Sequence, residues 1–368
     1  MMKRKWYFLL GLTALSLGGA YVYLDYMRIK GLTDMTNMTV LEQLEEDFKT
    51  CPIEQRPPLS DETQLLYNYA HYHDLHNMWN GKKGDQVWQE TLPYYRIAAA
   101  NGDYKANVRL QYLLSTERIM AGNPWPEIDR LNKQLEKQIP AVAHYKMYYY
   151  LKSDKGFTVN KNEELVFLRK AAGLGNREAQ YELSEILAGM NDRATLQARL
   201  KIIDLLLLCA SNQGLGVASN SLGIGYQSDK NYKEAAKVFH QGVKNGNDAS
   251  ARYLSRGFGT DFSPEDFYYL ALTRDPERAI RYKMIGEYLS HKYYLNPKVP
   301  DLDEIVPLPP APLPAWDGKI AFQRWYEGPS PAKPSDELMQ KLADKAGLDV
   351  KTGLPLQKKN APISTDDS

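Results

Sequence analysis

Small and apolar residues recur at intervals of four along much of the chain. The order Ala-x3-Gly-x3-Ala-x3-Leu occurs three times, and a variant with glycine first and serine third occurs once; the four stretches are residues 98–110, 171–183, 210–222 and 242–254. Positions four apart lie on one face of an α-helix, but a glycine inside a helix lowers its stability relative to alanine. The pattern therefore predicts a pair of helices around each central glycine, with small residues where the two helices approach.

The central glycines of these stretches are the predicted corners of the fold. Glycine takes the left-handed backbone conformation that closes a helix without steric cost. We therefore expect a sharp turn between two helices at each of Gly102, Gly175, Gly214 and Gly246.

The corner glycines are separated by 73, 39 and 32 residues, so the longest interval holds about two repeats. A further unit is expected near residue 139, with its apolar stripe on Ala143, Met147 and Leu151. A period of 32 to 39 residues is typical of solenoids, in which each helix pair buries its apolar face against the next pair. The sequence thus predicts an all-α fold, an α-solenoid of antiparallel helix pairs over residues 60–292.

The repeated order resembles a known family. Ala-Ala-x2-Gly-x3-Ala-x3-Leu, together with Lys-Glu-Ala-Ala-Lys-Val-Phe at residues 233–239, is similar to the Sel-1-like repeat, a two-helix unit related to the tetratricopeptide repeat. The aromatic residue that usually precedes the alanine pair appears as Tyr95 and Phe167. The glycine pair of the family's loop is largely missing, and so are the cysteines that staple the repeats of some secreted members. The resemblance covers residues 60–292 and implies the same α-solenoid.

The N-terminal region predicts that most of the protein is located outside the cytoplasm. Three basic residues precede residues 6–24, an uncharged stretch long enough to cross a bilayer as a helix. Basic residues ahead of a span favour an inside N-terminus with the bulk outside. Residues 1–25 are therefore interpreted as a signal anchor in the bacterial inner membrane, with residues 26–59 as a linker. The alternative is a cleaved signal peptide, because Gly18-Gly19-Ala20 resembles a cleavage site.

The C-terminal region differs in composition from the repeats. Residues 293–334 are rich in proline, which disfavours helix, so an extended connector is expected there. Residues 335–368 are expected to hold one short helix and a tail, with Ser335 as its N-cap and Gly347 as its stop. The stretch between Trp325 and residue 356 resembles the C-terminal end of an uncharacterised group of bacterial Sel-1-like proteins. Some members of that group sit beside toxins of type VI secretion.

Composition narrows the function. The net charge of +1 gives no general attraction for nucleic acid or anionic membranes, so no nucleic-acid partner is expected. The 26 tyrosines against 9 phenylalanines indicate half-buried surfaces and protein interfaces. Of the two cysteines, Cys51 is expected in a loop and Cys209 in the core. We expect them to be unpaired, although a disulfide could form in an oxidising compartment.

Few residues point to catalysis or to a cofactor. His71, His73, Asp74 and His76 form the one histidine cluster, which we interpret as structural or surface histidines; a zinc site is the alternative. The glycine-rich stretch around Ser219 superficially resembles a dinucleotide-binding loop but falls in register with the repeat. The acidic residues 301–305 are expected in a solvated turn. No metal or cofactor is expected.

These observations favour a protein that is not an enzyme. The hypothesis is a non-catalytic, protein-binding solenoid that faces the periplasm, and the tail resemblance suggests an immunity protein that neutralises a secreted toxin of type VI secretion. Two alternatives remain: a scaffold for envelope assembly, and an enzyme of envelope polymers that uses the solenoid as a scaffold.

The expected binding surface lies on the helix that contains Ala-Val-Ala-His-Tyr-Lys-Met-Tyr-Tyr-Tyr-Leu. Tyr145 and Tyr149 point away from its predicted apolar stripe, with Lys152 beside them. Tyrosine is a frequent anchor at the centre of interfaces. The alternative is that these rings pack against an adjacent repeat.

Overall fold

The computed structural model describes residues 36–356, except residues 80, 121, 158–162 and 262. Within these residues the regular structure is helical, apart from one isolated bridge between Leu348 and Pro355. The predicted all-α class is confirmed for this part of the chain. None of the described helices is long and apolar enough to span a membrane, and the span expected at residues 6–24 lies outside the described residues.

The chain divides into two compact units. Unit 1 is made of Met1–Gln55, Pro140–Ser290 and Lys298–Gly318, and unit 2 of Arg56–Ile139, His291–Pro297 and Lys319–Ser368. The second boundary along the chain falls after Ile139, where the repeat lacks its corner glycine.

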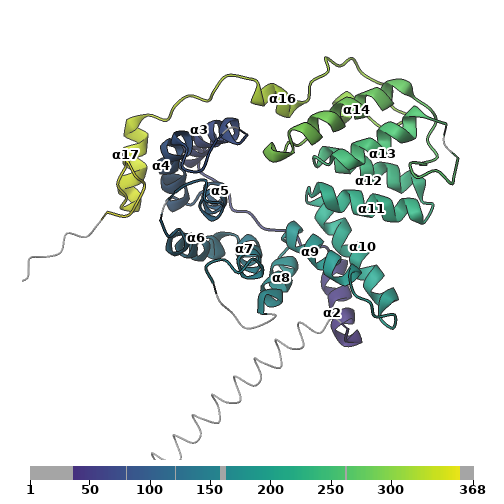
Figure 1. The fold of residues 1–368 in the computed structure, drawn as a ribbon, viewed down its shortest axis with the longest axis horizontal. Helices are drawn as coiled ribbons and strands as arrows, with labels where there is room; N and C mark the ends of the chain where they lie inside the picture. The colour runs from purple at the N-terminus through teal and green to yellow at the C-terminus, as the bar shows by residue number, and fades with distance from the viewer. Residues whose placement is uncertain (1–35, 80, 121, 158–162, 262, 357–368) are drawn as a thin grey trace, which may run out of the picture. The chain divides into compact units, whose positions relative to one another are not determined.

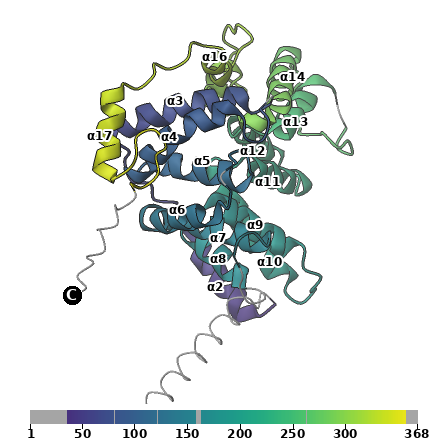
Figure 2. The same ribbon diagram turned by 60° about the vertical axis from the view of Figure 1, so that its left-hand side comes forward.

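Unit 1 is a row of helices in which, from α7 to α13, each helix packs against the one that follows (Figures 1 and 2). Its helices are α2 (Met38–Lys49), α7 (Pro140–Lys152), α8 (Glu163–Gly173), α9 (Arg177–Ala188), α10 (Leu196–Asn212), α11 (Gly216–Ser228), α12 (Tyr232–Lys244), α13 (Asp248–Gly259), α14 (Pro276–His291) and α15 (Leu302–Ile305). This arrangement is consistent with a helical solenoid.

Unit 2 repeats the pattern on a smaller scale. Its helices are α3 (Asp61–Asn77), α4 (Gln86–Ala100), α5 (Tyr104–Ser115), α6 (Trp125–Gln138), the 3-10 helix η1 (Tyr293–Leu295), α16 (Ala321–Tyr326) and α17 (Asp336–Ala346). Helices α3 to α6 pack in succession, and α17 packs against α4. The Ser335 hydroxyl accepts a hydrogen bond from the Leu338 amide at the start of α17, and Gly347 ends this helix with a φ of +66°.

All four corner glycines have a left-handed backbone and lie between two helices. Their φ angles are +98° at Gly102, +91° at Gly175, +92° at Gly214 and +83° at Gly246. The residue after each glycine donates its N–H to the carbonyl five positions earlier, as from Asn176 to Ala171 at 2.9 Å. This bond satisfies a carbonyl that would otherwise lack a partner at the end of the helix.

The small residues of the repeat allow two helices to come close together. The first and third positions of the repeat are buried in every copy, including Ala171 and Ala179. At Gly242 in α12, an added Cβ would lie 2.3 Å from the Ser250 hydroxyl oxygen of α13. A larger side chain at this position would therefore push the two helices apart.

A segment ahead of the first predicted repeat belongs to the core of unit 1. Helix α2 begins after Asn37, whose side chain caps it, and it buries Leu41, Leu44 and Phe48 against residues of α8, α9 and α10. The sequence predicts a linker over residues 26–59. The structure differs because apolar residues three and four apart give α2 a buried face.

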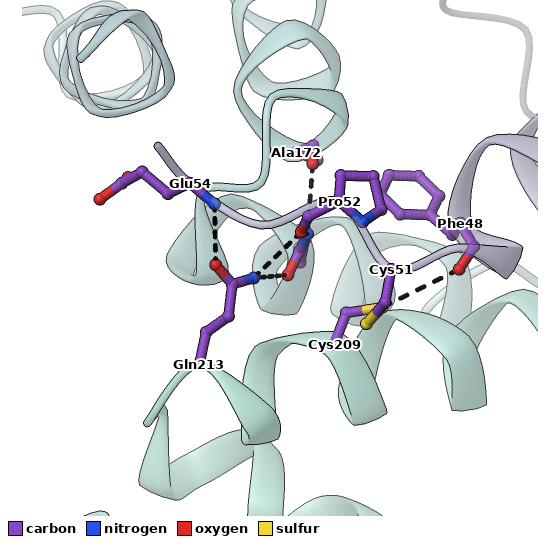
Figure 3. Close-up of a disulfide and its surroundings, with 8 residues drawn as sticks. Phe48, Cys51, Pro52, Glu54, Ala172, Cys209 and Gln213 are labelled. Carbon is purple, nitrogen blue, oxygen red and sulfur yellow. Dashed lines mark hydrogen bonds between the residues drawn. A yellow bond between two sulfur atoms is a disulfide. The ribbon is translucent and has the colours of Figure 1, made fainter. Parts of the chain in front are cut away.

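A disulfide between Cys51 and Cys209 joins the end of this segment to α10 (Figure 3). The Pro52 carbonyl also accepts hydrogen bonds from the side-chain amides of Gln180 (3.0 Å) and Gln213 (3.2 Å). The expectation of unpaired cysteines is wrong. The two residues are 158 positions apart, and the packing of α2 on α10 brings them together.

Residues 298–318 of the proline-rich segment are held on unit 1, and the expected extended connector over residues 293–334 is interrupted by η1, α15 and α16. Arg281 Nη1 donates to the carbonyls of Ile305 (2.7 Å) and Pro314 (2.8 Å). Arg278 Nε donates to the Pro307 carbonyl at 3.1 Å. Proline leaves carbonyls that no helix or strand can satisfy, and the two buried arginines supply the missing donors.

Candidate protein-binding surface

The predicted binding residues occupy helix α7 of unit 1, but they differ in their surroundings. Tyr149 keeps 49% of its surface exposed, whereas Tyr145 is partly buried and packs against the hydrophobic core of this unit. Burial also raises the pKa of Tyr145. Within α7, the buried side chains include Tyr148 and Tyr150, while Met147 of the expected apolar stripe is only half-buried.

Lys152 is held by a carboxylate of α9. Its ammonium forms a salt bridge with Glu182, which also accepts a hydrogen bond from the Tyr148 hydroxyl at 2.9 Å. The bond to Glu182 raises the pKa of Lys152. The ring of Tyr148 is buried, but its hydroxyl has a hydrogen-bond partner, so this tyrosine can lie in the core without leaving a polar group unsatisfied.

A second group of charges, which no local sequence pattern predicts, lies close to these residues. We call it the basic cluster: Lys146 of α7, Arg177 at the start of α9, and Lys298 after α14, around the carboxylate of Glu178. Arg177 Nε donates to Glu178 Oε1 at 2.9 Å, and its Nη1 donates to the Gln213 carbonyl at 2.8 Å. Glu178 is also close enough to act electrostatically on both lysines.

Both lysines of the basic cluster are poorly hydrated. Burial lowers the pKa of Lys146 to about 8, and the charge of Glu178 opposes this shift. Burial and the charge of Arg177 lower the pKa of Lys298 to about 8 as well. The Lys298 ammonium donates to the Asn245 carbonyl at 2.7 Å. Unit 1 therefore carries partly desolvated positive charge beside the tyrosines of α7.

Two comparisons place this fold among known proteins. The model of a domain of unknown function, DUF6396, matches residues 250–356. Among solved structures, PA5086 of Pseudomonas aeruginosa and the immunity protein Pa5087 from the same organism are each 24% identical to this chain, with a TM-score of 0.50. Each match covers 71% of this chain and 95% of that chain. This chain shares their fold.

The other comparisons are negative. No curated protein matches the sequence. A Sel-1-like repeat is not among the matching family models, so the repeat resemblance remains a description of the sequence pattern.

The histidine cluster of unit 2 includes Asp74, which forms a buried ion pair with Arg109. Asp74 accepts hydrogen bonds from Arg109 Nε (2.5 Å), Tyr95 (2.8 Å) and Trp88 (3.1 Å). Burial alone would raise the pKa of Asp74, but the contacts with Arg109 hold it below its ordinary value. In the described part of the chain, no three His, Cys, Asp or Glu side chains are arranged to hold a metal ion.

The histidines themselves make structural contacts. His76 stacks on Tyr326 and contacts its carbonyl at 2.9 Å. His71 stacks on Tyr67, and burial lowers its pKa to about 4. The glycine-rich stretch around Ser219 is part of α11 and forms no phosphate-binding loop.

A third polar group in unit 1 combines a histidine, a carboxylate and a tyrosine, as catalytic sites often do, but its contacts are structural. His240 contacts Asp303 Oδ1 and the Tyr282 hydroxyl, each at 2.7 Å. Tyr282 is fully buried and also donates to the Val306 carbonyl at 3.2 Å, so its oxygen is not available to a substrate. Residues 301–305 are not the expected solvated turn, because Leu302 and Ile305 of α15 are buried.

Sequence reasoning could find α7 but not the basic cluster. The tyrosine content of α7 is visible in one short stretch, whereas the cluster combines residues 146, 177–178 and 298. Lys298 lies in the proline-rich segment, and only the contacts that fix this segment to unit 1 bring it near α9.

Proposed function

We propose that this protein is a non-catalytic immunity protein, which neutralises a toxin by binding it. The observation that carries the proposal is the fold, which this chain shares with the immunity protein Pa5087 over 95% of that chain. At 24% identity this likeness concerns the fold, so the binding chemistry must come from this chain's own surface. The α7 surface supplies an exposed tyrosine and a partly desolvated positive charge.

The polar groups of the protein support binding rather than catalysis. The networks around Asp74 and around His240 are tied to buried side chains and to backbone carbonyls. Catalytic groups need access to a substrate and a defined place for the reacting atom. These networks instead stabilise the packing of helices and of the proline-rich segment.

We propose that the protein works in the periplasm, held in the inner membrane through residues 6–24. The paired Cys51 and Cys209 support this location, because structural disulfides form in oxidising compartments such as the periplasm. A reporter that is active only outside the cytoplasm, fused after residue 40, should be active. Activity of a cytoplasm-only reporter at the same position would contradict this location. A mature protein that begins at Tyr21 would show signal cleavage instead of anchoring.

The proposed partner is a toxin of type VI secretion, as the resemblance of the C-terminal segment suggests. The products of the genes that neighbour this one should each be expressed in a bacterial host with a periplasmic export signal. One of them should arrest growth, and coexpression of this protein should restore growth and retain the toxin in a pull-down. Growth arrest that persists despite stable expression of this protein would refute neutralisation of that toxin.

A further inference from the structure

We propose that the basic cluster of unit 1 receives an acidic side chain or an acidic loop of the protein partner. The existence of a toxin partner rests on the proposed function, whereas the chemistry of the cluster rests on the residues of this chain. The cluster combines Lys146, Arg177 and Lys298 with the single carboxylate of Glu178.

The basic cluster has an excess of positive charge. Arg177 forms the direct ion pair with Glu178, at 2.9 Å. The same carboxylate is the anion that acts electrostatically on Lys146 and on Lys298. One carboxylate cannot neutralise three cations, and unneutralised charge that is partly removed from water is costly unless a counter-ion arrives.

Of the three cations, Lys146 would be stabilised most by a carboxylate from the protein partner. Its side chain is surrounded by protein, yet part of its surface remains accessible to solvent. Among the described residues, no carboxylate forms a salt bridge with its ammonium, and the carboxylate that acts on it electrostatically, Glu178, is already paired with Arg177. A carboxylate that reaches this ammonium would interact more strongly than at an open surface, because less water screens the charges.

The other two cations are already positioned by the fold. Arg177 donates to the carbonyl of Gln213, the C-cap of α10, and Lys298 donates to the carbonyl of Asn245, the C-cap of α12. Cations at helix C-termini are stabilised by the helix dipole. The partner therefore need not order these two side chains on binding, and an ordered site loses less entropy.

The surroundings of the basic cluster favour a protein over a membrane. Tyr149 lies one turn from Lys146 on α7 and is exposed, so it can pack against the segment that carries the acidic group. A lipid surface is broad and would favour exposed lysines, whereas Lys146 is largely enclosed. A protruding acidic side chain fits such a place better than a flat layer of headgroups.

The first test uses a fluorescein-labelled decaglutamate peptide and the full chain, with fluorescence anisotropy at low ionic strength. We expect binding that weakens as salt is added, and an affinity at least tenfold lower for Lys146→Met with no decrease in Tm. Lys201→Met is the matched control, because Lys201 is exposed on α10, and its affinity should equal that of the parent. Equal affinities for the parent and Lys146→Met would overturn the proposal. So would binding to phosphatidylglycerol vesicles or inorganic phosphate without binding to the peptide.

The second test observes Lys146 directly. Lysines carrying 13C-methyl groups should be titrated by NMR, with Lys146→Met used to assign the signal. The peptide should raise the pKa of Lys146 from near 8, because a bound carboxylate stabilises the protonated form. An unchanged pKa at saturating peptide would show that the acidic group binds elsewhere.

The growth assay separates this inference from the proposed function. If the parent protein restores growth and Lys146→Glu restores it equally well, the role of the basic cluster is wrong and the immunity function stands. If the parent restores growth with none of the neighbouring toxins but binds the peptide through Lys146, the immunity function fails and the acidic-group site stands.

Discussion

The sulfur of Cys51 is bonded to that of Cys209, so the chain that leaves α2 is joined to α10 across 158 residues of sequence. Beside this bond, an added Cβ at Gly175 would lie 2.4 Å from the backbone of Ile53 and Glu54. The segment after α2 is therefore fixed covalently to α10 and sterically at the Gly175 corner.

Removing the disulfide should destabilise unit 1. A cross-link that closes a long loop reduces the entropy of the unfolded chain, so Cys51→Ser with Cys209→Ser should cost about 2–4 kcal/mol. Urea unfolding followed by circular dichroism measures the change. A reducing agent should lower the midpoint of the parent and leave that of the double variant unchanged. Two reactive thiols in protein purified from the periplasm would contradict the disulfide.

Gly175 should tolerate substitution less well than Gly214, although both have a φ near +90°. At Gly214, an added Cβ would meet side chains rather than backbone, the guanidinium of Arg177 at 3.1 Å and the amide oxygen of Asn245 at 3.8 Å. Gly214→Ala should therefore cost about 1 kcal/mol for its left-handed backbone. Gly175→Ala should cost at least about 1 kcal/mol more, because backbone atoms must move. Equal losses of unfolding free energy for the two variants, measured by urea unfolding, would show that the backbone at Ile53 moves aside at little cost.

Acid should weaken unit 2 through His71 before its carboxylates protonate. Burial lowers the pKa of His71 to about 4 in the folded protein, whereas an unfolded histidine titrates near 6.5. The unfolded chain thus binds the additional proton between these values, and stability falls as the pH falls from about 6.5 to 4. We expect a loss on the order of 2 kcal/mol over this range.

The control for this prediction is His71→Phe, which keeps an aromatic ring beside Tyr67. Measured by denaturant midpoints, the parent should lose stability relative to the variant as the pH falls from 7 toward 4, because only the parent carries the histidine whose pKa is lowered by folding. Parallel profiles for the two proteins would assign the acid sensitivity to other groups.

Arg281 should hold the proline-rich segment on unit 1. Arg281→Met leaves the carbonyls of Ile305 and Pro314 without their donor, at a cost of about 2 kcal/mol. Limited proteolysis should then cut between residues 298 and 318 faster than in the parent. Arg252→Met, which removes only an exposed pair with Asp248, should leave the cutting rate unchanged. Equal protection in both variants would mean that buried apolar residues alone retain the segment.

Lys146→Met should make the isolated protein more stable at neutral pH. The pKa of Lys146 is lowered in the folded state, so its charge opposes folding below about pH 8, and this penalty disappears above about pH 10.5. Even after allowance for solvent screening, the gain at pH 7 should be at least about 1 kcal/mol. The difference between the two Tm values should shrink as the pH rises through this window. A lower Tm for the variant at pH 7 would show that the side chain contributes mainly through packing.

The sequence predicted the helix pairs better than it predicted what binds them together. Corners such as Gly175 carry their own signal, because only glycine adopts a positive φ at no cost. Helix α2 was missed although its apolar residues are spaced for a buried face, because a short helix outside the repeat has no second copy for comparison. The disulfide and Lys298 could not be predicted from a local pattern, since each depends on a contact between distant parts of the chain.

The disulfide also makes a closed ring of the residues between Cys51 and Cys209, and this ring contains Arg56–Ile139, the main part of unit 2. A protease that cuts once anywhere in this stretch opens the ring but releases no fragment. The cut protein should run as one species on a non-reducing gel and as two after reduction. Unit 2 can therefore lose the continuity of its backbone while its two pieces stay linked, which keeps their effective concentration high enough to remain folded together.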